Sequence, residues 1–209
     1  MVRLCALLAL VALSPLLLLI AIAIVLDDGL PVLFRQTRVG IEGRLFRVVK
    51  FRSMRSGNLG LQVTSGNDSR VTRVGRFIRR YKLDELPQLW NLFRGHMNIV
   101  GPRPEVPIFV NAADPLWRST LLVKPGITCL ATLVYRNEED LLARMPNPEQ
   151  YYREILAPEK LRLNLNYLKH RCLLSDWKLL QLTVLSSLLP ARYDSEQVKR
   201  ILIDKECMQ

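Results

Sequence analysis

An apolar run opens the chain: residues 4–26 are 23 consecutive positions without a charged side chain. A straight helix of this length would reach roughly 34 Å, enough to cross the roughly 30 Å core of a bilayer. Ser14-Pro15 lies at its middle. Because proline lacks a backbone N–H and kinks a helix, each arm would reach only about 15 Å, half of that core. The pattern therefore predicts a broken apolar helix.

Three kinds of segment share this pattern. A secretory signal peptide fits least, because the run is longer than a signal-peptide core and no small-x-small cleavage site precedes Asp27-Asp28. A kinked helix that crosses the membrane and a re-entrant helix that enters and leaves on one face both fit. In either case, the basic residues that follow predict that the chain from Asp27 onward is cytoplasmic.

After the apolar run, the pattern changes to that of a β-hairpin. Residues 31–38 and 44–51 are rich in β-formers, and residues 40–43 between them have the composition of a turn. Residues 56–69 are rich in Gly, Ser and Asn, which predicts a loop, and one that could lie over a site. Residues 72–81 return to helical spacing. Their apolar stripe is Val74, Phe77, Ile78 and Tyr81, and their charged face is Arg76, Arg79 and Arg80.

Helical patterns also dominate the second half of the chain. Asn147-Pro148-Glu149 and Ala157-Pro158-Glu159 have the composition of helix starts, and residues 159–171 are predicted to be helical. Asp176 is the expected cap of a last, largely apolar helix at 177–189, which is too short to cross a bilayer. A chain of 209 residues with this pattern is expected to hold one domain plus an appendage.

The positive charge is concentrated in one segment. Residues 35–103 contain 15 Lys or Arg and four acidic residues, which accounts for the whole formal charge of +11. Such a segment is typical of a site for anions, whether phosphates, nucleic acid or an acidic membrane surface. The four cysteines and two histidines show neither disulfide nor metal-ligand spacing, which indicates reduced thiols in a cytosolic domain.

The stretch Leu83-Asp84-Glu85-Leu86-Pro87-Gln88 places two carboxylates inside this basic segment. Pro87 and a following apolar stripe predict a helix, with Asp84 at or just before its N-terminus. The members of that stripe are Leu86, Leu89, Trp90 and Phe93. An aspartate in this place is either an ordinary helix cap or a group beside a bound anion. Because neighbours at i and i+1 do not face each other on a helix, Asp84 and Glu85 are expected to have separate roles.

Basic side chains near the carboxylate pair are candidates to bind the anion. Lys50 and Arg52 end the second predicted strand, where they form either a phosphate clamp or a solvated hairpin end. Arg79 belongs to a helix face of one charge, which favours an anionic ligand. Arg103 lies between Pro102 and Pro104, which restrict the backbone on both sides of it.

The sequence resembles the bacterial sugar transferases, the monotopic phosphoglycosyl transferases that begin the assembly of polysaccharides and glycoconjugates. The resemblance covers nearly the whole chain, and its motifs are residues 14–15, 34–40, 50–54, 70–76, 83–88, 100–105 and 124–128. The Asp84-Glu85 pair and Gly101-Pro102-Arg103-Pro104 are the most specific of them.

The resemblance implies an α+β, mostly helical fold. Residues 1–28 would form a re-entrant membrane helix broken at Ser14-Pro15, and residues 29–209 a catalytic domain with an associated β-hairpin on the cytoplasmic face of the bacterial inner membrane. The implied reaction moves a sugar 1-phosphate from a UDP-sugar to polyprenyl phosphate and releases UMP, as the first membrane step of polysaccharide or glycoconjugate synthesis. The implied partners are the lipid bilayer and these two substrates, with no nucleic acid, and a homodimer is left open.

The resemblance also assigns roles to residues. Asp84 would be the nucleophile and carry a covalent sugar-phosphate, with Mg²⁺ beside it. Attack on a diphosphate needs its charge neutralised by the metal ion and by basic donors. The expected phosphate-binding residues are Lys50, Arg52, Arg79, Arg103 and Arg136. Glu85 would orient the acceptor or act as a base.

Departures from the family pattern occur at His96-Met97-Asn98, Cys129-Leu130 and Tyr135-Arg136. They leave the catalytic pair untouched and the sugar preference open. Two other hypotheses compete with the transferase. One is a membrane-anchored anion-binding module without catalysis. The carboxylate pair argues against this module, because two negative charges inside the basic segment would weaken the binding of an anion. The other is an enzyme with a single membrane span and its ends on opposite faces.

Overall fold

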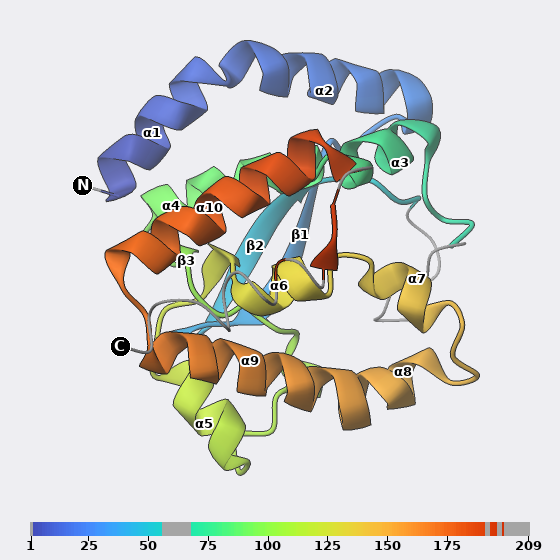
Figure 1. Cartoon of the computed structure of the whole chain (residues 1–209). Coiled ribbons are helices and arrows are strands. Elements are labelled where there is room, and N and C mark those ends of the chain that lie inside the picture. Colours follow the sequence, from blue (N-terminus) through green and yellow to red (C-terminus); the bar gives the residue numbers. More distant parts are fainter. Residues whose placement is uncertain (1, 56–67, 191–192, 196–197, 199–209) are drawn as a thin grey trace.

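The computed structural model describes residues 2–55, 68–190, 193–195 and 198, so most of the loop predicted at 56–69 lies outside the described residues. The chain begins with α1 (Val2–Ala12) and α2 (Ser14–Asp28), two helices bent by 60° that arch along one side of the molecule (Figure 1).

The bend falls at Leu13, directly before Ser14-Pro15, where the sequence predicts a break. Pro15 has no N–H to offer the carbonyl of Val11, four residues earlier. The Ser14 hydroxyl donates to that carbonyl instead, with an Oγ–O distance of 2.7 Å. Within the described residues, no single helix combines the length and apolar composition needed to cross a bilayer, whereas α1 and α2 taken together have both.

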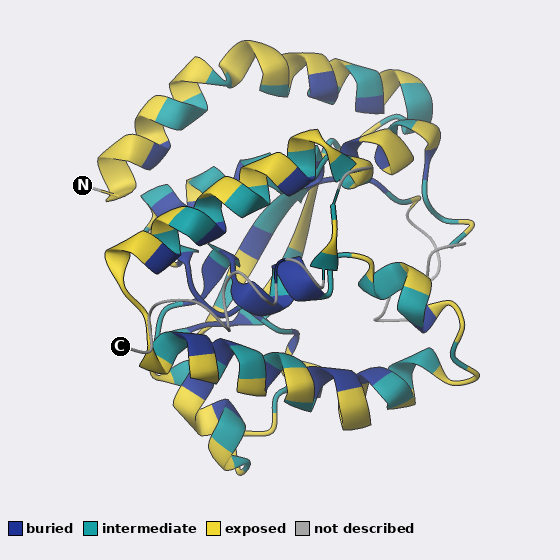
Figure 2. Ribbon diagram, in the orientation of Figure 1, coloured by how far each residue is buried: buried dark blue, intermediate teal, exposed yellow. Residues whose placement is uncertain are grey.

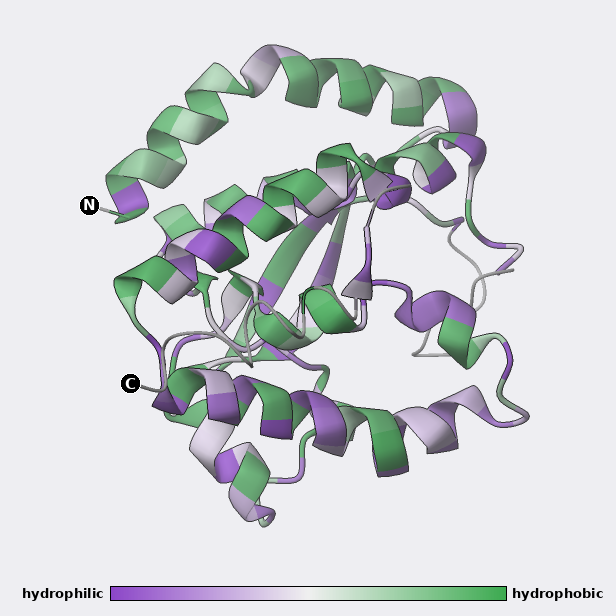
Figure 3. Cartoon of the chain, viewed as in Figure 1, coloured by the Kyte–Doolittle hydropathy of each residue, from purple (hydrophilic) through white to green (hydrophobic). Residues whose placement is uncertain are grey.

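The two helices bury little of their apolar surface against the rest of the chain. Only Ala6, Ile20 and Ile24 are buried along them, and the outer faces are exposed (Figure 2). Six of their side chains are more than 60% exposed: Leu4, Leu8, Val11, Leu18, Leu19 and Leu26. Figure 3 shows that the arch is apolar along almost its whole length and polar at its two ends. Exposed apolar surface of this extent is typical of an interaction site rather than of a surface in water.

The predicted hairpin is present, with Val39 of one strand and Val48 and Phe51 of the other buried. Strands β1 (Leu33–Val39) and β2 (Leu45–Phe51) pair antiparallel, with Leu33 opposite Phe51 and Val39 opposite Leu45. A short 3₁₀ turn, η1 (Ile41–Gly43), joins them. The pairing places Phe34, Gln36 and Arg38 on the same face of the hairpin as Lys50, Val48 and Phe46, because directly opposite residues share a face.

Three short elements follow the hairpin and pack against it. They are α3 (Arg73–Arg80), the 3₁₀ helix η2 (Leu83–Gln88) and α4 (Leu89–Phe93). Thr72 caps α3, since its hydroxyl accepts from the Gly75 N–H at 2.9 Å. Two apolar clusters fix the arch to these elements: Ala6 packs with Val48, Leu92 and Met97, and Ile20 and Ile24 pack with Phe51 and Ile78.

The remaining chain forms a mostly helical layer. A second small sheet pairs β3 (Asn98–Val100) with β4 (Gly126–Thr128) in parallel. Its other elements are η3 (Pro107–Phe109), α5 (Pro115–Leu121), α6 (Leu130–Val134), α7 (Glu138–Leu142), α8 (Pro148–Tyr151), η4 (Tyr152–Leu156), α9 (Ala157–Lys169) and α10 (Leu173–Leu188). Leu130, Leu133 and Leu179 lie in the core between α6 and α10.

Four details differ from the sequence expectation. Trp90 is 46% exposed and Phe77 is 57% exposed, so neither belongs to the buried stripe predicted for its helix. The α-helix α9 begins at Ala157, as predicted, but it continues directly from α8 and the π-helical turn η4 instead of starting after a loop. Asp176 does not cap α10, which begins at Leu173. Its carboxylate instead accepts from Tyr167 and Arg171.

Candidate active site

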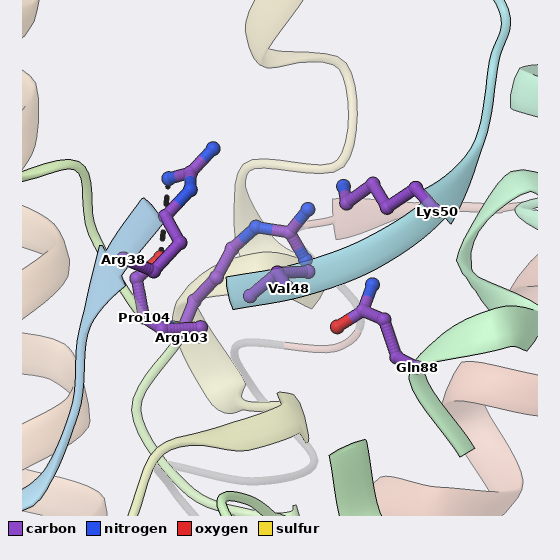
Figure 4. A pocket seen from close by; sticks show the side chains of 6 residues that line it. All are labelled: Arg38, Val48, Lys50, Gln88, Arg103 and Pro104. Carbon is purple, nitrogen blue, oxygen red and sulfur yellow. Dashed lines mark hydrogen bonds between the residues drawn. The ribbon is translucent and has the colours of Figure 1, made fainter. Parts of the chain in front are cut away.

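A small pocket lies where the hairpin, η2 and the 101–105 loop meet (Figure 4). Its lining residues are Arg38 from β1, Val48 and Lys50 from β2, Gln88 from η2, and Arg103 and Pro104 from the loop. Three of the six carry positive charge. The antiparallel pairing explains part of this arrangement, since it places Arg38, Val48 and Lys50 on one face of the hairpin.

Glu85 is the anionic partner of two of these cations. Lys50 Nζ lies 3.0 Å from Glu85 Oε1, and Arg103 donates to both carboxylate oxygens at 2.5 and 3.2 Å. The Glu85 side chain is 11% exposed. Burial alone would raise the pKa of Glu85, but the charges of Arg103 and Lys50 outweigh burial and hold that pKa well below its ordinary value of 4.5. Glu85 is therefore ionised, and both of its oxygens accept hydrogen bonds from cations, while its expected role as acceptor-orienting group or base stays a prediction.

Asp84 has a different environment from its neighbour. It is the second residue of η2, whose first turn follows Lys82 in a left-handed conformation (φ +56°). Asp84 is 7% exposed, and its Oδ1 accepts no hydrogen bond from the described residues. Burial raises the pKa of Asp84, and the attraction of Lys50 only partly offsets this effect. A buried carboxylate oxygen without a protein partner is available to a ligand, a metal ion or a reacting atom.

Arg79 projects from α3 toward the same region. Its Nη1 lies 3.5 Å from both Ser53 Oγ and Met54 Sδ, and its Nη2 forms an ion pair with Glu139 of α7. The Arg79 charge also lowers the pKa of Asp84, which places the two groups within electrostatic range. Arg79 does not share one exposed face with Arg76 and Arg80, as the sequence suggested, because its side chain is largely covered while those two are exposed.

Of the five expected phosphate-binding residues, only Lys50 and Arg103 line the pocket, and Arg52 and Arg136 are held by other contacts. Arg52 is 7% exposed and donates to the backbone carbonyls of Asp28, Gly29 and Leu30 at 2.6–3.0 Å. It thereby fixes the end of α2 to the end of β2. Arg136 donates to Ser186 Oγ and to the Arg80 carbonyl, and it stacks over the Tyr193 ring.

Sequence reasoning missed two pocket residues, Arg38 and Gln88, and the carboxylate that holds one of them, Glu105. The sequence does contain a pattern that points to Arg38. In a hairpin with a turn at 40–43, Arg38 and Lys50 fall on the same face, so a phosphate-binding role for Lys50 points to Arg38 as well. No comparable pattern singles out Glu105, whose partners Arg38 and Tyr152 are 67 and 47 residues away in the sequence.

A protein-only metal site is not formed by the described residues, which contain no group of three or more His, Cys, Asp or Glu side chains suited to a metal ion. Mg²⁺ is often held by one or two carboxylates together with substrate phosphates and water. The unpartnered Oδ1 of Asp84 fits that mode. Glu85 fits it less well, since both of its oxygens accept from Arg103 or Lys50.

Comparisons with known proteins agree on one family. A sequence model described as bacterial sugar transferase matches residues 2–189. The chain is 39% identical over 183 residues to the UDP-glucose:undecaprenyl-phosphate glucose-1-phosphate transferase of Escherichia coli (strain K12), covering 85% of this chain and 37% of that protein.

Two further relatives are similar over shorter stretches. The undecaprenyl-phosphate glucose phosphotransferase of Komagataeibacter xylinus is 48% identical over 130 residues, covering 58% of this chain and 24% of the relative. The UDP-N-acetylgalactosamine-undecaprenyl-phosphate N-acetylgalactosaminephosphotransferase of Aeromonas hydrophila is 44% identical over 137 residues, covering 63% of this chain and 32% of that relative. The chain thus spans 24–37% of the length of these three relatives.

Proposed function

Because the chain belongs to the bacterial sugar transferase family, we propose that it transfers a sugar 1-phosphate from a UDP-sugar to polyprenyl phosphate and releases UMP. The names of the relatives support the reaction class, since each describes a sugar phosphotransferase that acts on undecaprenyl phosphate. The observation that carries the proposal is the buried Asp84 carboxylate, with an unpartnered oxygen, beside Lys50 and the cationic pocket.

The proposed chemistry has two steps through Asp84. An Asp84 oxygen attacks the sugar-bearing phosphorus of the donor, and the bond from that phosphorus to the bridging oxygen breaks, so UMP leaves with the bonding electron pair. An oxygen of polyprenyl phosphate then attacks the same phosphorus, and the bond to Asp84 breaks. Each step forms and breaks one P–O bond, so no water or redox partner is consumed. Carboxylates act as covalent catalysts in this way in phosphoryl transfer.

The cations of the pocket would neutralise the negative charge of the donor during these steps. A UDP-sugar carries two negative charges on its diphosphate, and the transfer adds charge to the leaving oxygen. Lys50 and Arg103 donate to Glu85 and also line the pocket, so they can hold the diphosphate without being released from Glu85. The role of Glu85 in this proposal is to hold these two cations together rather than to take up a proton.

Mg²⁺ is the proposed cofactor. Asp84 would be its protein ligand, and its chemistry would be the neutralisation of charge on the donor phosphates. The proposal rests on the free Oδ1 and on the burial that raises the pKa of Asp84, because a nearby cation would favour the ionised, nucleophilic form.

The arch of α1 and α2 is the proposed membrane anchor. Its exposed apolar surface and its break at Ser14-Pro15 support a re-entrant helix, with the catalytic domain on the cytoplasmic face of the bacterial inner membrane. A half-buried site beside the bilayer would suit both a soluble nucleotide sugar and a lipid phosphate. Such a transfer would be the first membrane step in the synthesis of a polysaccharide or glycoconjugate.

Topology has its own test. A cysteine placed at Val2, in a chain with Cys5 replaced by serine, is expected to resist an impermeant thiol reagent applied from outside the inner membrane. A matched cysteine at an exposed position of the cytoplasmic domain, such as Arg35, gives the protected reference. Labelling of the Val2 position from outside would show a spanning helix instead of a re-entrant one.

The reaction is tested with UDP-sugars radiolabelled in the sugar, Mg²⁺ and purified protein without lipid. We expect label on the protein with stoichiometric UMP, and transfer of the label to lipid when polyprenyl phosphate is added. Asp84→Asn should abolish both steps. Asp114→Asn is the matched control, because Asp114 caps the distant helix α5 and asparagine is an equally good cap.

The outcomes separate the hypotheses. Full activity in Asp84→Asn would exclude this residue as nucleophile. UMP release only when lipid is present would indicate direct transfer between the two substrates. No UMP from any UDP-sugar, with or without lipid, would favour a non-catalytic anion-binding module.

A further inference from the structure

Arg38 occupies the end of the pocket that lies away from Lys50 (Figure 4). In that view Lys50 and Arg103 point toward one another, and Arg38 lies beyond Arg103. The electrostatic neighbours agree with this order. Burial raises the pKa of Asp84, and the charges that act on it are Lys50, Glu85, Lys82 and Arg79. Burial lowers the pKa of Arg38, and its strongest charged neighbours are Glu105 and Arg103, with Glu85 acting more weakly.

The guanidinium of Arg38 is held in place by hydrogen bonds, but they do not use all of its N–H groups. Its Nε and Nη2 donate to Gln36 Oε1 at 3.0 and 2.6 Å, and its Nη1 donates to the Pro104 carbonyl and to Glu105 Oε1 at 3.1 and 3.0 Å. An arginine has five N–H groups, and these contacts use four. One N–H of Nη2 therefore has no acceptor among the described residues, although the side chain is only 19% exposed.

Glu105 is anchored on its other side as well. Its Oε2 accepts a hydrogen bond from the hydroxyl of Tyr152, a buried residue of the π-helical turn η4. Its Oε1 also accepts from the Val106 N–H at 2.9 Å. Because both carboxylate oxygens are held, Glu105 fixes the direction of Arg38 and the position of the loop that carries Arg103.

We propose that the Arg38 end of the pocket binds the phosphate of the leaving nucleotide, while the Asp84 and Lys50 end binds the sugar phosphate. This inference rests on the proposed function. In-line attack places the leaving oxygen on the side of the phosphorus opposite the nucleophile. Lys50 lines the other end of the pocket, and its charge has the strongest effect of any charge on the pKa of Asp84. Attack from the side of Asp84 therefore points the bridging oxygen and the UMP phosphate past Arg103 toward Arg38.

The chemical role of Arg38 follows from this placement. When the bond to the bridging oxygen breaks, that oxygen becomes part of the UMP phosphate and gains negative charge. The free N–H of Arg38 can donate to that phosphate, and no rearrangement is needed because Gln36 and Glu105 already hold the guanidinium. Once UMP has left, the second step does not involve the nucleotide, so Arg38 should not affect it. Glu105 and Tyr152 are positioning residues, since they act through Arg38.

The first measurement is the binding of UMP to the 209-residue chain, by calorimetry in detergent with Mg²⁺. Arg38→Ala is expected to weaken UMP binding by about ten- to a hundredfold, as for the loss of one hydrogen bond to a charged group. Arg38→Lys keeps the charge but loses the planar fork, so an intermediate loss is expected. Arg35→Ala is the matched control, because Arg35 lies on the same strand, is exposed and has no ion pair among the described residues.

The two half-reactions are then measured separately. Formation of labelled protein from the UDP-sugar should slow in Arg38→Ala. Labelled protein freed from nucleotide by desalting should transfer its sugar-phosphate to polyprenyl phosphate at the wild-type rate. Glu105→Gln should reproduce this pattern with a smaller effect, since it leaves Arg38 in place but less firmly held.

Wild-type UMP affinity in both Arg38→Ala and Arg38→Lys would overturn the inference, as would equal slowing of both half-reactions. Failure of the wild-type protein to bind UMP would also overturn it. Failure of the proposed function looks different: wild-type protein would bind UMP, with a loss in Arg38→Ala, but would form no labelled intermediate and release no UMP from any UDP-sugar.

Discussion

Replacing Glu85 with glutamine is expected to destabilise the fold as well as slow the reaction. The Glu85 carboxylate has two cationic partners, Lys50 at 3.0 Å and Arg103 at 2.5 and 3.2 Å. Glutamine keeps the shape but removes the charge, which leaves two largely covered cations close together without a counter-ion. Removal of one partner from a buried ion pair costs about 3–5 kcal/mol.

Partial exposure reduces this cost. Lys50 is 21% exposed and Arg103 is 26% exposed, so water screens part of their repulsion. We therefore expect a loss of about 2–4 kcal/mol in the free energy of unfolding. For a protein of this size each kcal/mol corresponds to about 2–4 °C in Tm, so the Tm should fall by about 5–15 °C.

The assay is thermal unfolding of purified protein in one detergent, with activity measured on the same samples. Glu42→Gln is the matched control, because Glu42 also pairs with an arginine but is 59% exposed. Its Tm should change by about 1–2 °C at most, as for an exposed ion pair. Adding Lys50→Met to Glu85→Gln removes one unpaired cation and should restore part of the lost Tm, since residues in one network are coupled.

An unchanged Tm in Glu85→Gln would refute this reasoning. A base role for Glu85 predicts a different pattern, in which stability is retained and one ionisation disappears from the pH–rate profile. The wild-type protein gives a further check. Because the pKa of Glu85 is held well below 4.5, its ion pairs stabilise the fold above pH 4.5, and this contribution is lost as the pH falls through the lowered pKa. Glu85→Gln should therefore be less sensitive to acid below pH 4.5 than wild type.

Three other substitutions test separate parts of the structure. Asp84→Asn should leave the Tm unchanged or raise it. Burial raises the pKa of Asp84, so the ionised carboxylate destabilises the folded protein at neutral pH. For the same reason, the rate of intermediate formation by the wild-type protein should rise as the pH increases through that raised pKa. Arg52→Lys should cost about 2 kcal/mol, measured by thermal unfolding, because a lysine cannot reproduce the fork of donors to the α2 end. Gly75→Ala should destabilise the fold by about 1–3 kcal/mol, since the alanine Cβ would lie 2.0 Å from the Ser53 carbonyl oxygen. It should also reduce activity, because a shift of α3 would move Arg79, which lies on the same helix. Unchanged stability in thermal unfolding would show that α3 shifts freely.

Local patterns predicted the elements whose causes are local. The hairpin follows from β-formers on either side of a glycine turn, and the bend of the arch follows from the missing N–H of Pro15. Lys50, Asp84, Glu85 and Arg103 were identified through motifs, and the structure brings all four to one region.

Arg52 shows where such reasoning fails. Lys50 and Arg52 are two residues apart, so a continuous strand would point both toward the pocket. Arg52 lies just beyond the end of β2, however, and its side chain donates to the carbonyls at the end of α2. The predicted cap of α10, Asp176, was wrong for a different reason. Cys172 and Ser175 form its capping box, with the Cys172 N–H donating to Ser175 Oγ at 2.9 Å, and cysteine is not among the usual cap residues.

The adjacency of Asp84 and Glu85 has a physical explanation in this arrangement. A pocket for a dianion needs several cations, but buried cations repel one another when no ligand is bound. Glu85 relieves that repulsion between Lys50 and Arg103, so they stay in place in the free protein. A carboxylate used in this way has no oxygen left to react. The residue before it in the helical turn points in another direction, and Asp84 lies within the electrostatic range of Lys50 with its Oδ1 unpartnered. In the proposed reaction, the pair thus separates the group that holds the cations from the group that attacks phosphorus. Exchanging the two, as Asp84→Glu with Glu85→Asp, should impair both stability and turnover.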